Sequence, residues 1–323
     1  EPNTFGWIVE IDPFNPDSVP QKRTALGRFG HEGVIFGKLE EGKPVVVYSG
    51  DDSTFEYIYK FVSSAPYYKN TAGGHLLNDG TLYVARFNED GSGDWLPLDI
   101  TNADFIAKAA AAGVSFADQA DVLLNTRLAA DVAGATKMDR PEWVTVHPTS
   151  GEVYVTLTNN SGRTAVNDAN PRTNNIYGQI VRWRETGGDA AATTFDWDIF
   201  VLAGNPSVTA NKGTLKAGSS NVTADNTFNS PDGLGFDQFG RLWIQTDGKY
   251  SNAADYANQG NNQMLVADIT TKKITRFLVG PAGCEVTGVC WTPDGRTMFI
   301  NIQHPGEVGS HPNAPAAYKS ATD

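Results

Sequence analysis

An internal repeat is the feature that most constrains this chain, because copies of one short unit must be arranged around or along a common axis. Each copy has an acidic residue, a short apolar segment, a turn, a second apolar segment and a polar cluster. The clearest copy runs from Ser230 to Gly248, and further copies cover residues 140–160, 284–304 and 31–52. Two apolar segments joined by a turn predict a β-hairpin in each copy.

Segments with alternating apolar and polar residues lie between the copies and are typical of further strands. They are residues 55–62, 81–87, 180–184, 195–202, 264–269 and 274–279. Two hairpins per unit, arranged radially, is the pattern of a β-propeller. We therefore predict an all-β propeller that forms a single domain over residues 1–323. A β-sandwich is the alternative, but it does not explain why an acid recurs at the start of each unit.

Residues 101–138 break this pattern. The segment is rich in Ala, and the apolar residues Phe116, Leu123, Leu124 and Leu128 follow one another at helical spacing. This spacing predicts a helical insertion between two blades. We expect the insertion to pack against the rim of the propeller, and a functional lid is the alternative.

Four acids occupy the same place in the four copies: Glu32, Glu142, Asp232 and Glu285. The first strand of each propeller unit runs along the central channel, so equivalent positions in successive blades should converge on one ring. Carboxylates that converge repel one another and need cations to stay ionised together. Ca²⁺ fits best because it accepts six to eight oxygen ligands in loose geometry. The alternative is that each acid is an ordinary turn or cap residue.

Arg140 stands two residues before Glu142, so on a strand both side chains point the same way. An arginine beside a metal-bound carboxylate suits the binding of phosphate, because the guanidinium matches phosphate bidentately. The alternative is an ion pair that only stabilises the ring. Polar residues that close the second strands are expected to be mostly turn residues, and the alternative is that they add ligands or hold the ligands in place. They are Asp51, Asp52, Asn159, Asn160, Asp247 and His304. Glu307 is a further candidate ligand.

The formal net charge of −12 argues against nucleic acid as a partner, since an acidic surface repels its phosphates. An anionic substrate would need local positive charge, which a bound metal can supply. No apolar run reaches the ~18 residues of a membrane span. The motifs of serine hydrolases, P-loop enzymes and zinc proteases are missing as well. Among the histidines only His31 stands beside a ring acid, and we expect it to be a packed side chain.

These motifs together resemble the PhoX-type alkaline phosphatases. Matching stretches follow the family's order along nearly the whole chain: residues 1–12, 22–33, 47–61, 81–88, 126–143, 177–185, 230–248 and 284–307. RPEW at 140–143 and NIQHPGE at 301–307 are the most specific of them. The likeness is to the later part of the family sequence. The family's iron-ligating cysteine precedes the position that matches Glu1, and neither Cys284 nor Cys290 corresponds to it. We therefore expect an N-terminal portion to be missing here.

The resemblance implies a six-bladed propeller, of which this chain covers about four blades. It also implies an exported enzyme, periplasmic or secreted, that hydrolyses phosphomonoesters at a cluster of Ca²⁺ and Fe³⁺ ions bridged by an oxo group. By this resemblance Glu32 and Glu142 are metal ligands, and Arg140 is the catalytic, phosphate-binding arginine. Asp232 and Glu285 are assigned as metal ligands chiefly by the repeat. We expect a monomer.

Two other functions stay open. The Pro-Asp-Gly-Leu-x-Phe-Asp pattern at 231–237 also occurs in gluconolactonase-like propellers, which bind one Ca²⁺ and open lactones. A calcium-stabilised propeller without enzymatic activity is the other possibility. Turnover of a lactone, of a phosphomonoester or of neither would separate the three.

Overall fold

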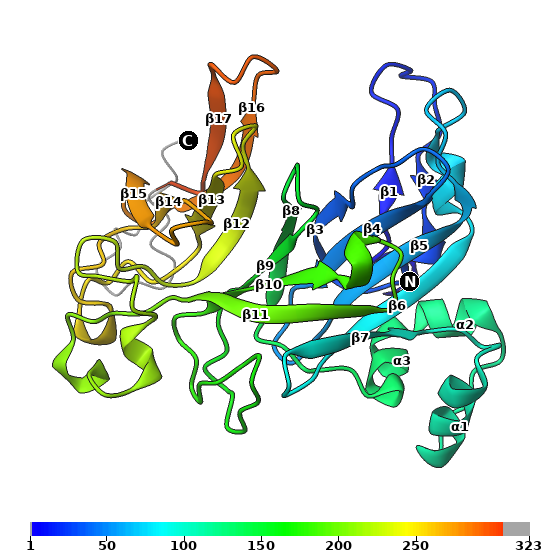
Figure 1. The fold of residues 1–323 in the computed structure, drawn as a ribbon, viewed down its shortest axis with the longest axis horizontal. Coiled ribbons are helices and arrows are strands. Elements are labelled where there is room, and N and C mark those ends of the chain that lie inside the picture. Colours follow the sequence, from blue (N-terminus) through cyan, green and yellow to red (C-terminus); the bar gives the residue numbers. More distant parts are fainter. Residues whose placement is uncertain (1, 306–323) are drawn as a thin grey trace. The chain divides into compact units, whose positions relative to one another are not determined.

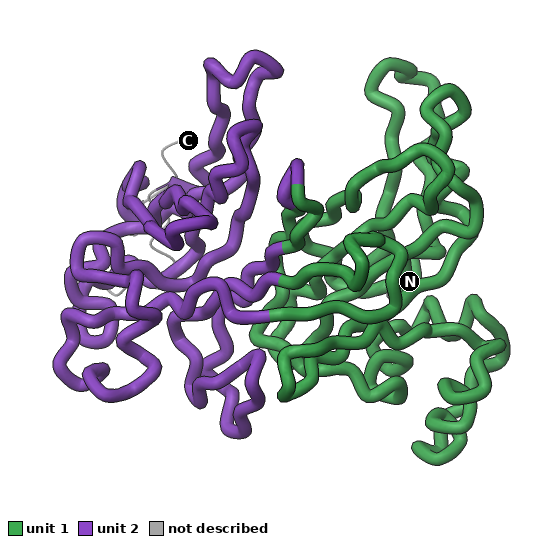
Figure 2. The backbone as a smooth tube through the Cα atoms, in the orientation of Figure 1, with its two compact units in different colours: residues 1–146, 150–153, 183–197 green, residues 147–149, 154–182, 198–323 purple. Residues whose placement is uncertain are grey.

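The computed structural model describes residues 2–305 of the chain. It divides into two compact units (Figure 2). Among the described residues, unit 1 comprises residues 2–146, 150–153 and 183–197, and unit 2 comprises residues 147–149, 154–182 and 198–305.

Strands make up most of the regular structure (Figure 1). Those of unit 1 are β1 (Val9–Glu10), β2 (Gln21–Lys22), β3 (His31–Phe36), β4 (Pro44–Asp51), β5 (Ile58–Pro66), β6 (Gly80–Phe87), β7 (Ser92–Pro97) and β8 (Pro141–Val146). Three strands run from one unit into the other: β9 (Val153–Leu157), β10 (Gln179–Glu185) and β11 (Thr194–Leu202). Unit 2 holds β12 (Pro231–Phe236), β13 (Leu242–Thr246), β14 (Gln263–Ala267), β15 (Ile274–Val279), β16 (Glu285–Trp291) and β17 (Met298–Gln303).

Helices are few. The α-helices are α1 (Ala103–Ala111), α2 (Gln119–Leu124) and α3 (Thr126–Ala133), and all three belong to unit 1. Short 3₁₀ helices cover Pro2–Thr4, Thr24–Leu26, Gly74–Leu77, Thr186–Gly188, Thr209–Asn211, Leu215–Ala217 and Ala254–Tyr256. No helix among the described residues is both long and apolar enough to cross a membrane.

The sheets have the connectivity of propeller blades. Consecutive strands pair in the runs β3-β4-β5-β6, β8-β9-β10-β11 and β12-β13-β14-β15, while β16 and β17 form a two-stranded sheet. The first two runs belong to one sheet of nine strands, in which β7 lies between β6 and β11. The four repeat copies are the hairpins β3–β4, β8–β9, β12–β13 and β16–β17. The prediction of an all-β propeller fold is confirmed, and the number of blades stays a prediction.

The segment between β7 and β8 holds the helices α1, α2 and α3, and α3 contacts both α1 and α2 (Figure 1). Asn102 and Asp118 begin α1 and α2 by accepting hydrogen bonds from the backbone N–H groups three residues later. Gly134 ends α3 in the left-handed conformation, with φ of 84°. Ala129 and Ala130 of α3 are buried in the apolar core of unit 1. The insertion is therefore packed onto the sheet.

Candidate functional site

Three carboxylates meet in unit 2. Asp232 at the start of β12, Asp247 just after β13 and Glu285 at the start of β16 each offer one oxygen, and these oxygens lie within 4.8 Å of one another. Asp232 and Glu285 are buried and Asp247 is half-buried. Sequence reasoning named Asp232 and Glu285 as a pair of ligands, and the structure brings these two together.

Asp247 joins them because of the antiparallel pairing in the hairpin. Pro231 at the start of β12 is the partner of Thr246 at the end of β13, so Asp232 and Asp247 lie diagonally across the hairpin, within reach of each other. The backbone N–H of Asp247 donates to the carbonyl of Ser230 (3.1 Å), which closes the hairpin. The sequence leaves Asp247 open as a turn residue or a ligand, with the turn favoured. Strand pairing decides where it lies, because it brings the closing polar residue of a repeat close to that repeat's first acid.

The donor set suits a hard cation. Three carboxylates at this separation repel one another strongly unless a cation neutralises them. Gln245 lies two residues before Asp247, on β13, and is fully buried. Within residues 2–305, neither atom of its side-chain amide has a hydrogen-bond partner. Its amide oxygen lies over Gly233, the neighbour of Asp232, where a side chain would collide with it. Carboxylate and amide oxygens are the ligands that Ca²⁺ prefers, so these residues fit that ion.

Glu285 has further partners at the end of its own hairpin. Its register partner Gln303 donates from Nε2 to Oε2 of Glu285 (2.6 Å), and Nε2 of His304 lies 3.7 Å from the same oxygen. The polar residues that close β17 thus hold the carboxylate that opens β16. Cys284, directly before Glu285, is a buried thiol packed with Trp243 and Met264. Burial raises the pKa of this thiol.

Unit 1 contains the other two predicted ligands. Glu32, on β3, accepts a hydrogen bond from Nε1 of Trp143 (3.0 Å), the residue that follows Glu142 on β8. Gly33 lies so close to the backbone of Trp143 that a Cβ there would be 2.6 Å from its Cα. This close approach lets β3 lie against β8. Glu32 of β3 and Glu142 of β8 are therefore carried by adjacent strand starts.

Arg140 and Glu142 form an ion pair, Nη2 to Oε1 at 2.8 Å. The carboxylate of Glu142 is buried, whereas the Arg140 side chain keeps a quarter of its surface exposed (26%). Arg140 also binds Asp52 bidentately, through Nε (2.9 Å) and Nη2 (3.0 Å). Its backbone φ is 56°, the left-handed region that non-glycine residues rarely adopt. The guanidinium is thus placed by two acids and by an unusual backbone conformation.

His31 is a packed residue, as expected. Its Nδ1 lies 3.0 Å from Oγ of Ser49 and its Nε2 lies 3.0 Å from the carbonyl oxygen of Gly27. The ring is 3.6 Å from the ring of Phe29, centre to centre. Burial lowers the pKa of His31 to about 4, so the imidazole is neutral near pH 7. The hydrogen bonds use both nitrogens and leave neither for a metal.

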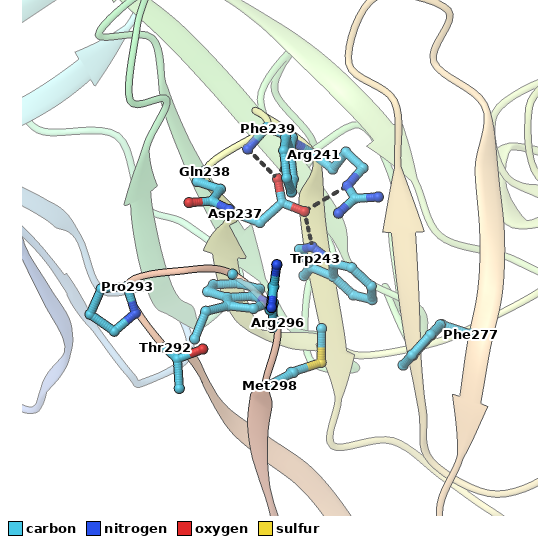
Figure 3. Close-up of a pocket in the computed structure, with 12 residues that line it drawn as sticks. Asp237, Gln238, Phe239, Arg241, Trp243, Phe277, Thr292, Pro293, Arg296 and Met298 are labelled. Carbon is cyan, nitrogen blue, oxygen red and sulfur yellow. Dashed lines mark hydrogen bonds and ion pairs between the residues drawn. The ribbon is translucent and has the colours of Figure 1, made fainter.

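A separate cavity of about 500 Å³ lies at the other end of the β12–β13 hairpin (Figure 3). The carboxylate of Asp237 accepts hydrogen bonds there from Nε of Arg241 (2.6 Å) and Nε1 of Trp243 (3.0 Å), as Figure 3 shows. Asp237 lies five residues beyond Asp232, or roughly 16 Å along a strand. None of the predicted ligands in the described part of the chain lines this cavity. It is therefore distinct from the acidic cluster.

The four acids of the predicted ring are divided between the two units. Glu32 and Glu142 belong to unit 1, and Asp232 and Glu285 belong to unit 2. The convergence of all four, and their role as metal ligands, stays a prediction. Glu307 lies outside the described residues.

Comparisons with known proteins agree with one family. The sequence profile of the family described as alkaline phosphatase PhoX matches residues 1–306. Among solved structures, the chain is similar to the PhoX of Pseudomonas fluorescens in complex with vanadate, a transition state analogue. The two are 53% identical with a TM-score of 0.87, over 95% of this chain and 54% of that chain. The chain thus spans about half the length of this relative. A comparison with curated proteins gave no match. The chain belongs to the PhoX family of alkaline phosphatases.

Proposed function

We propose that the protein of which this chain is part, or which it constitutes, is a metal-dependent alkaline phosphatase that hydrolyses phosphomonoesters. The convergence of Asp232, Asp247 and Glu285 carries the proposal, because three close carboxylates need a cation and a cation can hold phosphate. The similar Pseudomonas fluorescens protein was solved with vanadate, a transition state analogue. Vanadate resembles a phosphoryl group in transfer, which supports the same chemistry here.

The metal bound in each unit would be Ca²⁺. Asp232, Asp247 and Glu285 would be its ligands in unit 2, and Glu32 and Glu142 would be its ligands in unit 1. When bound, it would neutralise the charge of the phosphate group and so favour attack on phosphorus. Fe³⁺ is implied by the family resemblance alone. Among the described residues, the candidate ligands for Fe³⁺ are oxygen donors. Cys284 is a buried thiol, and burial raises its pKa.

Arg140 would bind the equatorial oxygens of the phosphate. A guanidinium presents its donors in a planar fork that fits two such oxygens, and it stays charged at every working pH. Asp52 and Glu142 hold this group before any substrate arrives, so little reorganisation would be needed. In the overall reaction a water oxygen adds to phosphorus, the ester P–O bond breaks, and the alcohol leaves with a proton. Arg140 would stabilise the charge on the phosphoryl oxygens as this exchange proceeds.

The substrates would be small phosphomonoesters, and nucleic acid is not expected as a partner of a chain with net charge −12. An exported location, periplasmic or secreted, and a monomeric state are part of the proposal. They are supported by the family resemblance.

The proposal is tested with 4-nitrophenyl phosphate and a lactone offered to the same Ca²⁺-loaded preparation. Hydrolysis of the phosphate ester, inhibited by vanadate and lost on chelation, is the expected result. The variant Arg140→Ala combined with Glu142→Gln should lower kcat/KM by about 10³-fold or more, since it removes one preorganised charge and one ligand. Undiminished turnover in that variant rejects these roles. Lactone turnover would favour the gluconolactonase-like alternative, and no turnover with strong calcium stabilisation would favour a scaffold. Elemental analysis for Ca and Fe identifies the metals.

A further inference from the structure

The helical insertion reaches the edge of the unit 1 site through one side chain. Arg127, on the first turn of α3, binds the carboxylate of Asp51 with two nitrogens, Nε to Oδ2 at 2.8 Å and Nη2 to Oδ1 at 2.5 Å. The Asp51 side chain is completely buried. A buried carboxylate without a partner is costly, so this arginine is needed to keep Asp51 where it is.

Asp51 ends β4, and the corner that follows is fixed by backbone hydrogen bonds. The N–H of Gly30 donates to Oδ1 of Asp51 (3.1 Å), and the N–H of Asp52 donates to the carbonyl of Gly30 (2.9 Å). The N–H of Ser53 donates to the carbonyl of Asp51 (2.7 Å). Asp51 is therefore the anchor of a tight corner, and Asp52 is the next residue in it.

Asp52 in turn holds Arg140 bidentately, with both contacts between 2.9 and 3.0 Å. A continuous series of contacts thus runs from α3 through Arg127, Asp51 and Asp52 to Arg140. The N-terminal end of α3 is itself fixed, because Oγ1 of Thr126 accepts a hydrogen bond from the backbone N–H of Arg28 (3.0 Å). Each step is a hydrogen bond, an ion pair or a peptide bond.

We propose that Arg127 is a positioning residue for Arg140: by holding Asp51 it fixes the corner at Asp52 and thereby the place of the guanidinium that binds phosphate. This inference rests on the proposed function of Arg140. It gives the insertion a role beyond packing, since α3 supplies a charge on which the geometry of the site depends. Glu56 also faces Arg127, with Oε1 3.6 Å from its Nε.

The experiment compares vanadate affinity, measured by calorimetry on the Ca²⁺-loaded protein, among variants. Arg127→Met keeps the length and apolar stem of the side chain and removes both contacts to Asp51. We expect about tenfold weaker vanadate binding, because a small misplacement of a binding group costs one to two decades. Arg127→Lys keeps the positive charge but not the planar guanidinium, and it should lose less vanadate affinity than Arg127→Met. The matched control is Arg86→Met. It removes two hydrogen bonds, from Nε and Nη2 to Oδ2 of Asp94, at an arginine equally exposed (43%).

A double-variant cycle separates positioning from general destabilisation. In an Arg140→Ala background, Arg127→Met should cause no further loss of vanadate affinity, because the group it positions is gone. Two results would overturn the inference. One is that Arg127→Met and Arg86→Met have the same vanadate affinity while Arg140→Ala weakens vanadate binding. The other is that the losses of affinity from Arg127→Met and Arg140→Ala are additive in the double variant. If Arg140→Ala leaves vanadate affinity unchanged, the proposed role of Arg140 fails instead. Should Arg127→Met not fold, Arg127→Lys with the same cycle decides the question.

Discussion

Arg140 and Ser230 share one unusual backbone conformation, with φ of 56° and 51°, and each directly precedes the proline that opens an inner strand. Left-handed backbone at a non-glycine residue costs about 1–3 kcal/mol and persists only where surrounding contacts enforce it. At Ser230 those contacts are backbone hydrogen bonds to Tyr177 (2.7 Å) and from Asp247 (3.1 Å). The repeat therefore extends to the backbone, at the positions just before Glu142 and Asp232.

Substitutions at Ser230 should reveal this strain. Ser230→Val places a β-branched side chain in left-handed backbone and should destabilise the protein by about 2 kcal/mol. Ser230→Gly relieves the strain but loses the hydroxyl contact with Asn159, so its net effect should lie within about 0.5 kcal/mol of wild type. Urea unfolding curves measure both. Equal losses for the two variants would contradict a strained backbone.

The sequence was sufficient to predict the hairpins, because each strand carries its own apolar pattern and each turn its own Gly or Pro. The acids that open the first strands were identifiable for the same reason. Which polar residues at the ends of the second strands join these acids could not be decided from sequence, because Asp247 looks like any turn residue until strand pairing places it near Asp232.

Arg127 shows a second limit of sequence reasoning. It lies 76 residues from Asp51 in the chain, and no local pattern connects a helix in an insertion to the end of a strand. Gln245 is similar: in sequence it is one polar residue on an apolar strand, and only its burial without a partner marks it as unusual. Contacts between residues far apart in the chain leave no local pattern in a single sequence.

Asp247→Asn should have opposite effects without and with calcium. Without Ca²⁺ the variant should be more stable than wild type by about 0.5–1 kcal/mol, since one of three mutually repelling charges is gone. With Ca²⁺ in excess the order should reverse, because a lost ligand weakens binding and a bound ion stabilises by about 2.7 kcal/mol at 100 times its Kd.

Thermal melts with calcium and with chelator measure the effect of Asp247→Asn. Asp196→Asn, an exposed carboxylate on β11, is the control and should respond to calcium like wild type. A calcium-dependent gain in Tm that is the same in Asp247→Asn as in wild type would show that the cluster does not bind the ion.

The stability of the protein should fall as pH rises through the titration of Glu56. Burial, followed by the charge of Asp51, raises the pKa of Glu56 from 4.5 to about 7. Between these pH values the folded state binds more protons than the unfolded state, so stability decreases with rising pH. Glu56→Gln removes this penalty. It should stabilise the protein by about 1–2 kcal/mol at pH 8, discounted because the side chain is partly exposed, and by little at pH 4.5.

Denaturation of Glu56→Gln and wild type at these two pH values tests the sign. Glu89→Gln, at an exposed position, is the control and should leave the free energy of unfolding unchanged at both pH values. A stabilisation by Glu56→Gln that is larger at pH 4.5 than at pH 8 would refute the assigned pKa shift.

Lys60 and Glu185 form a buried ion pair in unit 1, Nζ to Oε2 at 3.1 Å, with both side chains almost fully buried. Nζ also donates to the carbonyl of Ala192 (2.6 Å), and Glu185 accepts from the hydroxyl of Tyr48 and from two tryptophan indoles, those of Trp95 and Trp183. Every hydrogen-bonding direction of the carboxylate is thus occupied. The pair specifies how β5 and β10 pack.

Lys60→Met should therefore cost about 3–5 kcal/mol at pH 8, because it leaves an uncompensated buried carboxylate. Burial already raises the pKa of Glu185, and the loss of the ammonium would raise it further. At pH 5 the orphaned Glu185 can take up a proton, so the cost of Lys60→Met should be smaller there. The double variant with Glu185→Gln should recover part of the loss at pH 8, since a neutral amide still accepts from Tyr48. Chemical denaturation at both pH values measures the free energies of unfolding. If the loss caused by Lys60→Met is the same at both pH values and additive with that of Glu185→Gln, the lysine does not compensate the charge of Glu185.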